Sequence, residues 1–451
     1  MGKLFGTDGV RGIANRELTC ELAYKIGQAG AYVLTKESKT SPKIVVGKDT
    51  RISCDMLESA LIAGFCSVGA TSIKVGIIPT PAVAFLTRMH KADAGVVISA
   101  SHNSMEYNGI KFFNSQGYKL KDSIEEEIED IILNDRFDEL GHFEGADIGK
   151  VIYEENGLVD YARYARSVTD CDFKGMKVAV DCANGANYMT APRALSKLGA
   201  DLLVFNNYPN GININANCGS THMESLCNMV KGTGFDVGIA FDGDGDRVLA
   251  VDEEGNIVDG DAIMAICAKE MIKEGTLKKN TVVGTVMSNL GLTKAGEQFG
   301  FNVIQASVGD RYVLEEMLAN GYNLGGEQSG HIIFLDHNTT GDGLVSAIKL
   351  LTVMKKTGKK LSVLAKEAIT VYPQVVVNAS IKNENKKEIK NDATLSSMIK
   401  DAEDKMNGKG RVLIRPSGTE PVTRVMLEGE DINMLKETAN AIAEYIESQY
   451  A

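Results

Sequence analysis

Short apolar runs and helical segments alternate along most of this chain. Runs rich in Val and Ile, such as KIVVGKDTR at 43–51 and MKVAVDCANGA at 176–186, end at Gly, Asp or Ser and lead into helix-like stretches. The run NTVVGTVMSNLG at 280–291 is followed by LTKAGEQFG in the same way. Because strands that alternate with helices usually pair in parallel, this pattern predicts an α/β protein with largely parallel sheets.

A weak internal repeat accompanies the alternation. Each unit is followed by a second apolar run that enters a polar, glycine-bearing loop, at 94–113, 236–252 and 323–336. Three such modules predict three related domains in a chain of 451 residues, since an ordinary domain takes about 150 residues. In open parallel sheets, loops at the strand ends line the ligand crevice, so we expect the three loops to serve one site.

The chain after about residue 370 has a different character. The strand-like segments VYPQVVVNASI and RVLIRPSGTEPVTRVMLEGED flank a run dense in Lys, Glu and Asn at 381–392. A final helix is expected over 433–449. The pattern predicts a small α+β domain, in which the charged run is a solvated surface.

The composition excludes several classes of protein. Hydrophobic residues make up 44% and charged residues 24%, which excludes wholesale disorder. A net charge of −12 argues against a nucleic-acid partner, although a small anionic substrate can bind a locally positive pocket. No long apolar window and no signal peptide are visible, and the eight cysteines contain no CxxC pair. We therefore expect a reduced, cytoplasmic protein without a membrane partner.

The strongest chemical signal is FDGDGDR at 241–247, directly after a predicted strand. Asp242, Asp244 and Asp246 stand at alternate positions and can converge on one side of a looping segment, while the glycines let the backbone wrap. Three like charges this close repel one another, so a dication is the natural compensation. Ligands that are all oxygen suit Mg²⁺ or Ca²⁺ rather than zinc.

Two other interpretations of this loop stay open. An EF-hand also begins Asp-x-Asp-x-Asp, and Glu253 falls at its twelfth position. However, Arg247 stands where the sharp-turn glycine belongs, and the preceding segment is strand-like. A haloacid-dehalogenase-type phosphatase would use Asp242 as its nucleophile, but it would leave the other loops without a role.

Ser101 stands at the end of another predicted strand, in VVISASHNSMEYNGIKFF. A serine at a strand end is a candidate nucleophile, although Ser99 and Ser104 are alternatives and a capping or turn role is common. No Gly-x-Ser-x-Gly segment is present, which argues against a hydrolase triad. His102 follows directly, and Lys111 lies downstream in NGIK.

Other glycine-bearing loops carry groups that suit sugar and phosphate binding. GGEQSGH at 325–331 offers a carboxylate, a hydroxyl and an imidazole, for sugar hydroxyls and for proton transfer. RPSGTEPVTR at 415–424 offers two guanidinium groups, two hydroxyls and backbone N–H groups, which suit a dianion. Arg11 in FGTDGVRG, and Lys48 and Arg51 in GKDTR, are weaker candidates, for which surface salt bridges are the simpler explanation.

These loops together, in this order, resemble the α-D-phosphohexomutase family over essentially the whole chain. The matching segments are FGTDGVRG, ISASHN with NGIKFF, FDGDGDR, GEQSGH and RPSGTEP. The resemblance implies three related α/β/α domains with mixed, largely parallel sheets and a C-terminal α+β domain of TATA-binding-protein-like fold, around a central cleft. We expect domains that carry the phosphoserine, metal-binding, sugar-binding and phosphate-binding loops at 1–155, 156–257, 258–369 and 370–451.

The resemblance also implies roles for individual residues. Ser101 matches the serine that is phosphorylated in active family members, and its phosphate completes a Mg²⁺ site made by Asp242, Asp244 and Asp246. The implied substrate-binding residues are Glu327, Ser329 and Arg247, with Arg415, Ser417, Gly418, Thr419 and Arg424 on the non-reacting phosphate. The implied catalytic residues beside Ser101 are Arg11, His102, Lys111 and His331, which would assist proton transfer or balance charge.

The implied activity is a phosphoryl relay. Phospho-Ser101 would donate its phosphoryl group to glucosamine monophosphate, giving a 1,6-bisphosphate whose other phosphate returns to Ser101. The implied cofactors are Mg²⁺, a catalytic hexose 1,6-bisphosphate and the phosphorylated Ser101. The expected partner is a small phosphosugar on the route to UDP-N-acetylglucosamine and peptidoglycan, and the chain is expected to be a monomer or homodimer.

Alternatives and one departure from the family pattern remain. SASHN and GEQSGH look more like the branch that acts on glucosamine phosphates than the phosphomannomutase/phosphoglucomutase branch, which stays the alternative. A Mg²⁺-dependent sugar phosphatase and a Ca²⁺-binding regulatory module are further alternatives. The family usually has proline after Ser-His-Asn, where this chain has Ser104, and loss of the fixed proline φ predicts a softer serine loop.

Overall fold

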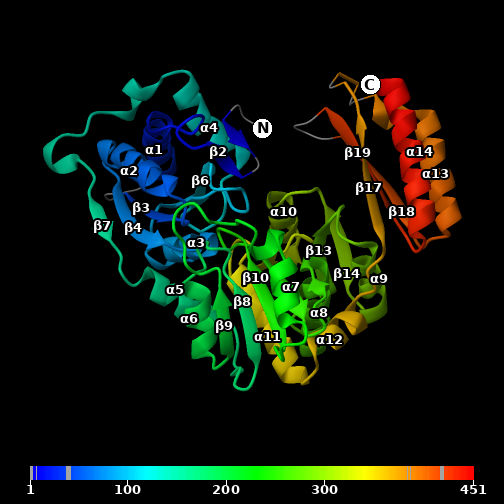
Figure 1. Ribbon diagram of the computed structural model, residues 1–451. Coiled ribbons are helices and arrows are strands. Elements are labelled where there is room, and N and C mark those ends of the chain that lie inside the picture. The colour runs from blue at the N-terminus through cyan, green and yellow to red at the C-terminus, as the bar shows by residue number, and fades with distance from the viewer. Residues whose placement is uncertain (1–3, 7, 37–41, 383, 386–387, 417–420) are drawn as a thin grey trace. The chain divides into compact units, whose positions relative to one another are not determined.

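The computed structural model describes residues 4–6, 8–36, 42–382, 384–385, 388–416 and 421–451. The chain divides into two compact units, Met1–Met287 with Gly300–Ala368, and Ser288–Phe299 with Ile369–Ala451. The first unit carries three sheets and the second carries one (Figure 1). No helix in the described part of the chain is long and apolar enough to cross a membrane.

A seven-stranded mixed sheet forms the first part of the larger unit. Its strands are β1 (Phe5–Gly6), β2 (Gly9–Ile13), β3 (Lys43–Lys48), β4 (Thr71–Ile77), β5 (Ala94–Ile98), β6 (Tyr107–Asn114) and β7 (Val151–Tyr153), in the order β1-β2-β6-β5-β3-β4-β7. Its helices are α1 (Cys20–Thr35), α2 (Ser53–Ser67), α3 (Thr80–Met89) and α4 (Asp122–Leu133). Alternate strand residues, such as Ile44 and Val96, share a core with α1, α2 and α4. On the opposite face, Gly47 and Gly95 lie against Val83 of α3.

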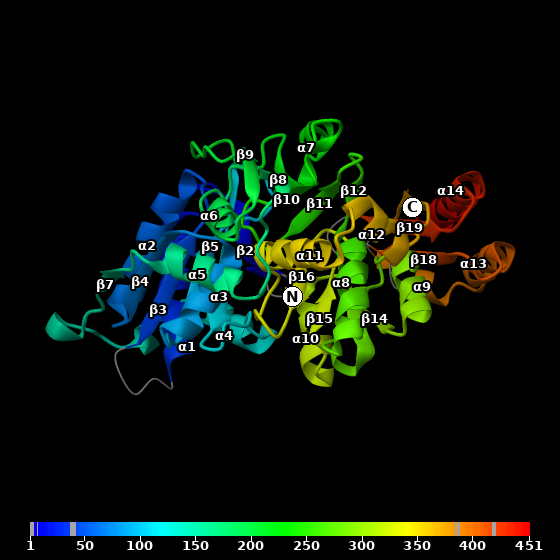
Figure 2. The ribbon, with the colours of Figure 1, turned by 90° about the horizontal axis from the view of Figure 1, so that it is seen from below.

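Two smaller sheets follow. The second contains β8 (Lys177–Asp181), β9 (Asp201–Phe205), β10 (Val237–Phe241), β11 (Val248–Asp252) and β12 (Ile257–Val258), in the order β12-β11-β10-β8-β9. The third contains β13 (Thr281–Thr285), β14 (Asn302–Ala306), β15 (Leu324–Gly326) and β16 (Ile332–Phe334), in the order β14-β13-β15-β16. The helices are α5 (Gly157–Arg166), α6 (Thr190–Lys197), α7 (Glu224–Val230), α8 (Gly260–Glu274), α10 (Asp310–Asn320), α11 (Gly343–Thr357) and α12 (Leu361–Ala368). Helix α11 packs against both α8 and α5 (Figure 2). This packing connects the module of the second sheet with that of the third.

The three sheets share one plan. Each contains three parallel strands and an antiparallel fourth, in the orders β4-β3-β5-β6, β9-β8-β10-β11 and β14-β13-β15-β16. The last two strands of each set are joined by one of the three polar loops that the sequence singled out. The prediction of an α/β fold with a threefold internal repeat is confirmed, and the three loops occupy equivalent positions in their modules.

The smaller unit is of α+β type, as predicted. It contains α9 (Leu290–Phe299), β17 (Gln374–Ser380), α13 (Ala393–Met406), β18 (Arg411–Pro416), β19 (Val422–Glu428) and α14 (Ile432–Tyr450). The strands form an antiparallel sheet in the order β17-β19-β18, and α13 and α14 share its core. The charged run at 381–392 is not a purely solvated surface, because Ile381 and Ile389 are each 4% exposed and belong to that core.

Candidate active site

Ser101 stands on the turn between β5 and β6 in a backbone conformation that is rare for serine. Its φ is +51°, in the left-handed region, which costs a residue with a Cβ about 1–2 kcal/mol. The residue is 1% exposed, and its Oγ donates a hydrogen bond of 2.6 Å to Oδ2 of Asp242. Nδ1 of His102 lies 3.4 Å from the same Oγ. The turn therefore directs the Ser101 hydroxyl at Asp242. This residue belongs to the acidic loop of the second module, which we define as residues 242–246.

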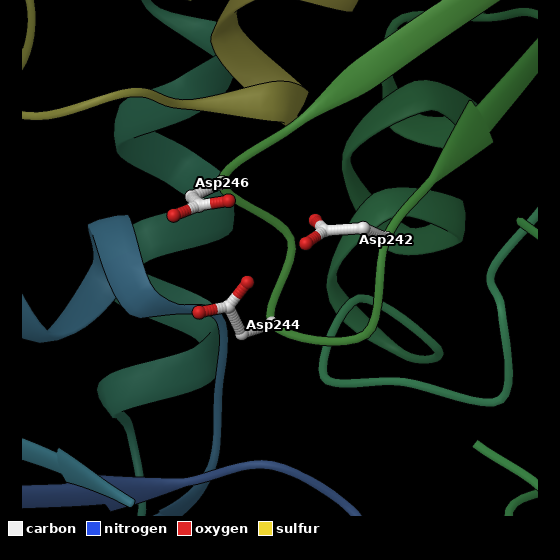
Figure 3. Close-up of side chains that lie close together, drawn as sticks. All are labelled: Asp242, Asp244 and Asp246. Carbon is white, nitrogen blue, oxygen red and sulfur yellow. The ribbon is translucent and has the colours of Figure 1, made fainter. Parts of the chain in front are cut away.

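The three aspartates expected to bind metal converge on the turn between β10 and β11 (Figure 3). Each offers a carboxylate oxygen within 4.8 Å of the other two, and all three residues are buried. Gly245 has a φ of +74°, and the N–H groups of Gly245 and Arg247 donate to Oδ1 of Asp242, both at 3.1 Å. No other such group of His, Cys, Asp and Glu occurs among the residues that the structure describes.

The charges of this acidic loop are only partly balanced by the protein. Burial, with the charges of Asp244 and Asp246, raises the pKa of Asp242 well above its ordinary value. Burial and Asp244 raise the pKa of Asp246 to about 6. Oδ1 of Asp244 and Oδ1 of Asp246 are buried without a hydrogen-bond partner. Two orphaned oxygens among three buried carboxylates fit a dication, and hard oxygen donors suit Mg²⁺.

Lys111 on β6 is the cation that the protein itself supplies to this loop. Its Nζ lies 2.9 Å from Oδ2 of Asp244 and 2.9 Å from Oδ2 of Asp8, and its side chain is 2% exposed. Burial opposes the charged form, but Asp244 and Asp8 outweigh it and raise the pKa of Lys111. Burial would likewise raise the pKa of Asp244, but Lys111 outweighs it and lowers that pKa. Lys111 is therefore held as a cation at the site.

Sequence reasoning missed three residues that extend this ion pair. Asp8 also pairs with Arg11 and, at 2.6 Å, with Lys119, and Lys119 in turn pairs with Asp310 of α10. Asp8 stands in FGTDGVRG and could have been singled out beside Arg11. Lys119 and Asp310 stand in segments without a motif, so only the tertiary fold reveals them.

The turn between β15 and β16 brings the third polar loop to the acidic loop. Arg247 and His331 form an isolated antiparallel bridge. Nε2 of His331 lies 3.8 Å from Oδ2 of Asp246 and 3.5 Å from Oδ2 of Asp310. Both ring nitrogens of His331 are buried without a hydrogen-bond partner, and the carboxylates of Asp246 and Asp310 are the charged groups nearest to the ring.

The remaining candidates of the larger unit differ in exposure. Glu327 is half-buried and accepts the N–H of Gly309 at 3.2 Å, whereas Ser329 is exposed. His102 is half-buried, and burial, with the nearby charges of Arg247 and Arg11, lowers its pKa to about 4. The His102 imidazole is therefore neutral at pH 7.

Two predicted phosphate-binding residues lie in the smaller unit. Arg415 of β18 and Arg424 of β19 are Cα partners in the antiparallel register, which puts their side chains on one face of the sheet. Two guanidinium groups on one face suit a dianion such as phosphate. Ser417, Gly418 and Thr419 lie outside the described residues.

The structure shows the surroundings of the weaker candidates Lys48 and Arg51, and it tests the EF-hand interpretation of the acidic loop. Lys48 pairs with Glu58 of α2 at 2.7 Å, and the Glu58 side chain is buried. Arg51 makes no surface salt bridge, because it is buried behind Ser101. The EF-hand interpretation is wrong, since Glu253 bonds to the backbone N–H of Ser362 and strands, not helices, flank the acidic loop.

Comparison with known proteins agrees with this geometry. Four models described as Phosphoglucomutase/phosphomannomutase match the chain: alpha/beta/alpha domain I at 2–139, domain II at 160–255, domain III at 259–372 and the C-terminal domain at 377–445. The phosphoglucosamine mutase of Ruminiclostridium cellulolyticum is 59% identical over 449 residues, which cover 100% of both chains. Further full-length relatives with that name are 56–58% identical.

Solved structures show the same fold. A phosphoglucomutase/phosphomannomutase family protein of Burkholderia thailandensis has a TM-score of 0.82 at 22% identity, covering 99% of this chain and 98% of that one. The N-acetylphosphoglucosamine mutase of Aspergillus fumigatus, solved in complex with GlcNAc-6P and magnesium, has a TM-score of 0.71 at 16% identity, covering 99% and 96%. Four matching domain models and full-length relatives near 59% identity lead to one conclusion. The chain belongs to the phosphoglucomutase/phosphomannomutase family of α-D-phosphohexomutases.

Proposed function

We propose that this chain is a Mg²⁺-dependent phosphoglucosamine mutase, which interconverts glucosamine 6-phosphate and glucosamine 1-phosphate. The observation that carries the proposal is the 2.6 Å hydrogen bond from Ser101 Oγ to Asp242, because it places a hydroxyl against three buried carboxylates. The full-length relatives named phosphoglucosamine mutase support the choice of sugar. The GlcNAc-6P and magnesium bound by the Aspergillus neighbour support a hexosamine phosphate and Mg²⁺.

Asp242, Asp244, Asp246 and phosphorylated Ser101 are the residues that would hold Mg²⁺. When bound, Mg²⁺ supplies charge neutralisation for the transferring phosphoryl group. Lys111 adds a second, fixed positive charge from the protein, since Asp8 and Asp244 hold it in the charged form. Phosphoryl transfer needs positioning and charge stabilisation more than it needs covalent chemistry, and this set of residues supplies both.

Transfer starts with a phosphoryl group on Ser101 Oγ and the free hydroxyl of glucosamine monophosphate. The bond from phosphorus to the sugar oxygen forms while the bond from phosphorus to Oγ breaks. The hydroxyl proton passes to a base, and Ser101 Oγ takes up a proton as it leaves. His102 is a candidate for this role because Nδ1 of its ring lies 3.4 Å from Ser101 Oγ. His331 is a second candidate, because neither ring nitrogen is hydrogen-bonded and Nε2 lies 3.8 Å from Asp246. Lys111 stays charged and so is assigned to charge stabilisation.

The product of this step is glucosamine 1,6-bisphosphate, which has to present its other phosphate to Ser101. We assign the remaining predicted residues to holding it: Glu327, Ser329 and Arg247 for the sugar, Arg11 for charge balance, and Arg415, Ser417, Gly418, Thr419 and Arg424 for the non-reacting phosphate. The expected central cleft and the boundaries after residues 155, 257 and 369 belong to the same proposal. A catalytic hexose 1,6-bisphosphate would reload Ser101 after any loss of its phosphate.

The cellular setting follows from the chemistry. All eight cysteines are free, which suits a reducing compartment. We assign the enzyme to the cytoplasm, where glucosamine 1-phosphate would serve the synthesis of UDP-N-acetylglucosamine and of peptidoglycan precursors.

Initial rates and mass spectrometry test the proposal together. The purified chain is assayed on glucosamine, mannose and glucose phosphates, each with Mg²⁺ and a catalytic 1,6-bisphosphate. We expect the highest kcat/KM on the glucosamine phosphates, and one phosphoryl group that peptide mapping places on Ser101. Ser101→Ala should lose both the phosphoryl group and the activity.

Other outcomes would contradict the proposal in distinct ways. A tenfold preference for mannose or glucose phosphate would assign the chain to the other branch of the family. Net release of inorganic phosphate that depends on Asp242 and not on Ser101 would indicate a phosphatase. Tight Ca²⁺ binding without turnover would indicate a regulatory module.

A further inference from the structure

Ser101 is held from behind by two side chains that donate to the same two carbonyl oxygens. Nη2 of Arg51 lies 2.9 Å from the carbonyl oxygen of Ser101 and 2.9 Å from that of Asn103. Nδ2 of Asn215 lies 2.9 Å from the first oxygen and 3.0 Å from the second. Arg51 follows β3 in the first module, and Asn215 lies between β9 and β10 in the second. The turn at 99–104 is therefore clamped by both modules.

Asp49 orients Arg51 and connects it to the other side of Ser101. Asp49 accepts the backbone N–H of Arg51 on Oδ1 and its Nε–H on Oδ2, both at 2.9 Å. Oδ2 of Asp49 also accepts the hydroxyl of Ser99, and that hydroxyl accepts the backbone N–H of Ser101 at 3.0 Å. The N–H of Ser101 is thus connected to Asp49 through the Ser99 hydroxyl, and its C=O accepts from Arg51. Both backbone groups therefore depend on the Asp49–Arg51 ion pair. The Asp49 and Arg51 side chains are 1% and 0% exposed, so bulk water does not compete for these bonds.

The acidic loop packs against the same clamp. A Cβ on Gly243 would lie 2.5 Å from the carbonyl oxygen of Ser101 and 2.7 Å from Nδ2 of Asn215. Only glycine lets the loop come this close to both atoms. The carbonyl that Arg51 and Asn215 hold therefore also sets the contact between the Ser101 turn and the loop that carries Asp242.

We infer that Arg51 and Asn215 are positioning residues, which hold Ser101 in its left-handed conformation and so keep its Oγ on the acidic loop. The inference rests on the proposed function, because it assigns both residues to the phosphoryl-transfer step. A serine at φ +51° is strained, and without its carbonyl donors it would relax and carry Oγ away from Asp242. A misplacement of about 1 Å can cost an enzyme about 10²-fold in rate. The amide of Asn215 and the guanidinium of Arg51 point at backbone carbonyls, so their loss should lower kcat and leave KM nearly unchanged.

Asn215→Asp is the sharpest test, because it keeps the size of the side chain and replaces the Nδ2 donor with an oxygen that repels both carbonyls. Asp tolerates the φ of +58° at this position. Asn184→Asp is the matched control, since Asn184 also has a positive φ, +47°, and is 8% exposed against 7% for Asn215. The Asn184 amide donates to the carbonyl of Asn213 at 3.4 Å and does not bond to the Ser101 turn.

The readouts are steady-state kinetics on glucosamine 6-phosphate and the rate at which Ser101 takes a phosphoryl group from glucose 1,6-bisphosphate, followed by intact mass. For Asn215→Asp we expect kcat and the phosphoryl uptake rate to fall about 100-fold, with KM within threefold of wild type. The Asn184→Asp control should stay within threefold on all three. Thermal unfolding by circular dichroism selects a temperature at which each variant is folded.

Arg51→Lys is the second variant. Lysine keeps the positive charge against Asp49 but lacks the planar fork that reaches Asp49 and the carbonyls together, so the same loss of kcat at nearly constant KM is expected. If Asn215→Asp is unfolded at every assay temperature, Arg51→Lys decides alone. Folded variants with wild-type kcat, or an equal loss in Asn184→Asp, overturn the inference. A wild-type chain that never takes up phosphate on Ser101 overturns the proposed function instead.

Discussion

Nζ of Lys111 and Oδ2 of Asp244 lie 2.9 Å apart in the interior of the protein. The two oxygens of the Asp244 carboxylate therefore have different surroundings. Oδ2 of Asp244 accepts from Lys111 and, at 2.8 Å, from Oγ1 of Thr80. Oδ1 of the same carboxylate is buried without a hydrogen-bond partner. One oxygen is thus fixed by the protein, and we propose the other as a ligand of the metal ion. Because Lys111 also binds Asp8, its replacement affects two carboxylates at once.

Lys111→Met removes the cation that Asp8 and Asp244 share. We expect kcat to fall by about 10²–10³-fold, since a fixed positive charge at the transferring group is lost. We also expect the free energy of unfolding to fall by about 3–5 kcal/mol, because the buried carboxylate of Asp244 loses its cation, whereas Asp8 keeps Arg11 and Lys119. Steady-state kinetics and urea unfolding measure the two effects.

Lys36→Met is a suitable control for the stability change. Lys36 pairs with Glu127, but both side chains are about two-fifths exposed. An exposed pair of this kind contributes less than about 1 kcal/mol, so the variant should unfold like wild type. Equal stability of Lys111→Met and Lys36→Met would show that the buried pair is not as important to folding as its geometry suggests.

Asp242→Asn should stabilise the metal-free protein while abolishing activity. An asparagine Oδ1 can still accept the N–H groups of Gly245 and Arg247, and the repulsion with Asp244 and Asp246 is relieved. In EDTA we expect Tm to rise by roughly 2–5 °C. The activity should fall more than about 10³-fold, and Mn²⁺ binding followed by electron paramagnetic resonance should weaken at least about tenfold.

Asp181→Asn is the control for this change, because Asp181 is also buried at the end of a strand. Its Oδ1 accepts the N–H of Ala183 and its Oδ2 accepts that of Gly219, both at 2.9 Å, so an amide there must lose one bond. Asp181→Asn should therefore lower Tm in EDTA. A lower Tm for both variants would argue that like-charge repulsion at Asp242 is too weak to matter.

The sequence predicted those parts of the fold and site that depend on local pattern. Strands and helices differ in the period of their apolar residues, and the three modules repeat that pattern, so the α/β architecture could be predicted. Asp242, Asp244 and Asp246 converge because they share one short turn with two glycines. Their closeness follows from the chain itself and needs no knowledge of the packing.

The parts that could not be predicted depend on contacts between distant segments. Lys119 and Asp310 are 191 residues apart and carry no motif, yet they pair beside His331. Arg51 was expected on the surface because arginine is mostly exposed, but the carbonyls of the Ser101 turn and the carboxylate of Asp49 satisfy its donors in the interior. Burial of a charge is decided by partners that the local sequence does not reveal.

The contribution of His337 to the stability of the protein should be lost in mild acid. Burial, with the charge of Lys349, lowers the pKa of His337 to about 4, below the ordinary value near 6.5 that applies in the unfolded chain. Between these two values the unfolded state binds the additional proton, so stability is lost as the pH falls through 6.5 toward 4. At pH 5.5 we expect the contribution of His337 to be smaller by about 1 kcal/mol than at pH 7.5.

Urea unfolding of wild type and His337→Gln at several pH values measures this contribution. The variant should lose less stability between pH 7.5 and pH 5.5, by about 1 kcal/mol. The same replacement at His142, which is exposed, is the control and should follow wild type. Parallel pH profiles for His337→Gln and wild type would refute the assignment.

Ser104→Pro tests whether the departure from the family pattern softens the serine loop. The carbonyl oxygen of Ser104 accepts the guanidinium of Arg51 and, at 3.2 Å, the N–H of Tyr107. Proline keeps that carbonyl, so both bonds can persist, and its fixed φ lowers the conformational entropy of the unfolded chain. Because Arg51 and Asn215 already hold the turn, we expect kcat within about twofold of wild type and a gain in stability of about 0.4–1 kcal/mol. A rise in kcat of tenfold or more would instead mean that the turn is loose in the wild-type chain and that the clamp alone does not fix Ser101.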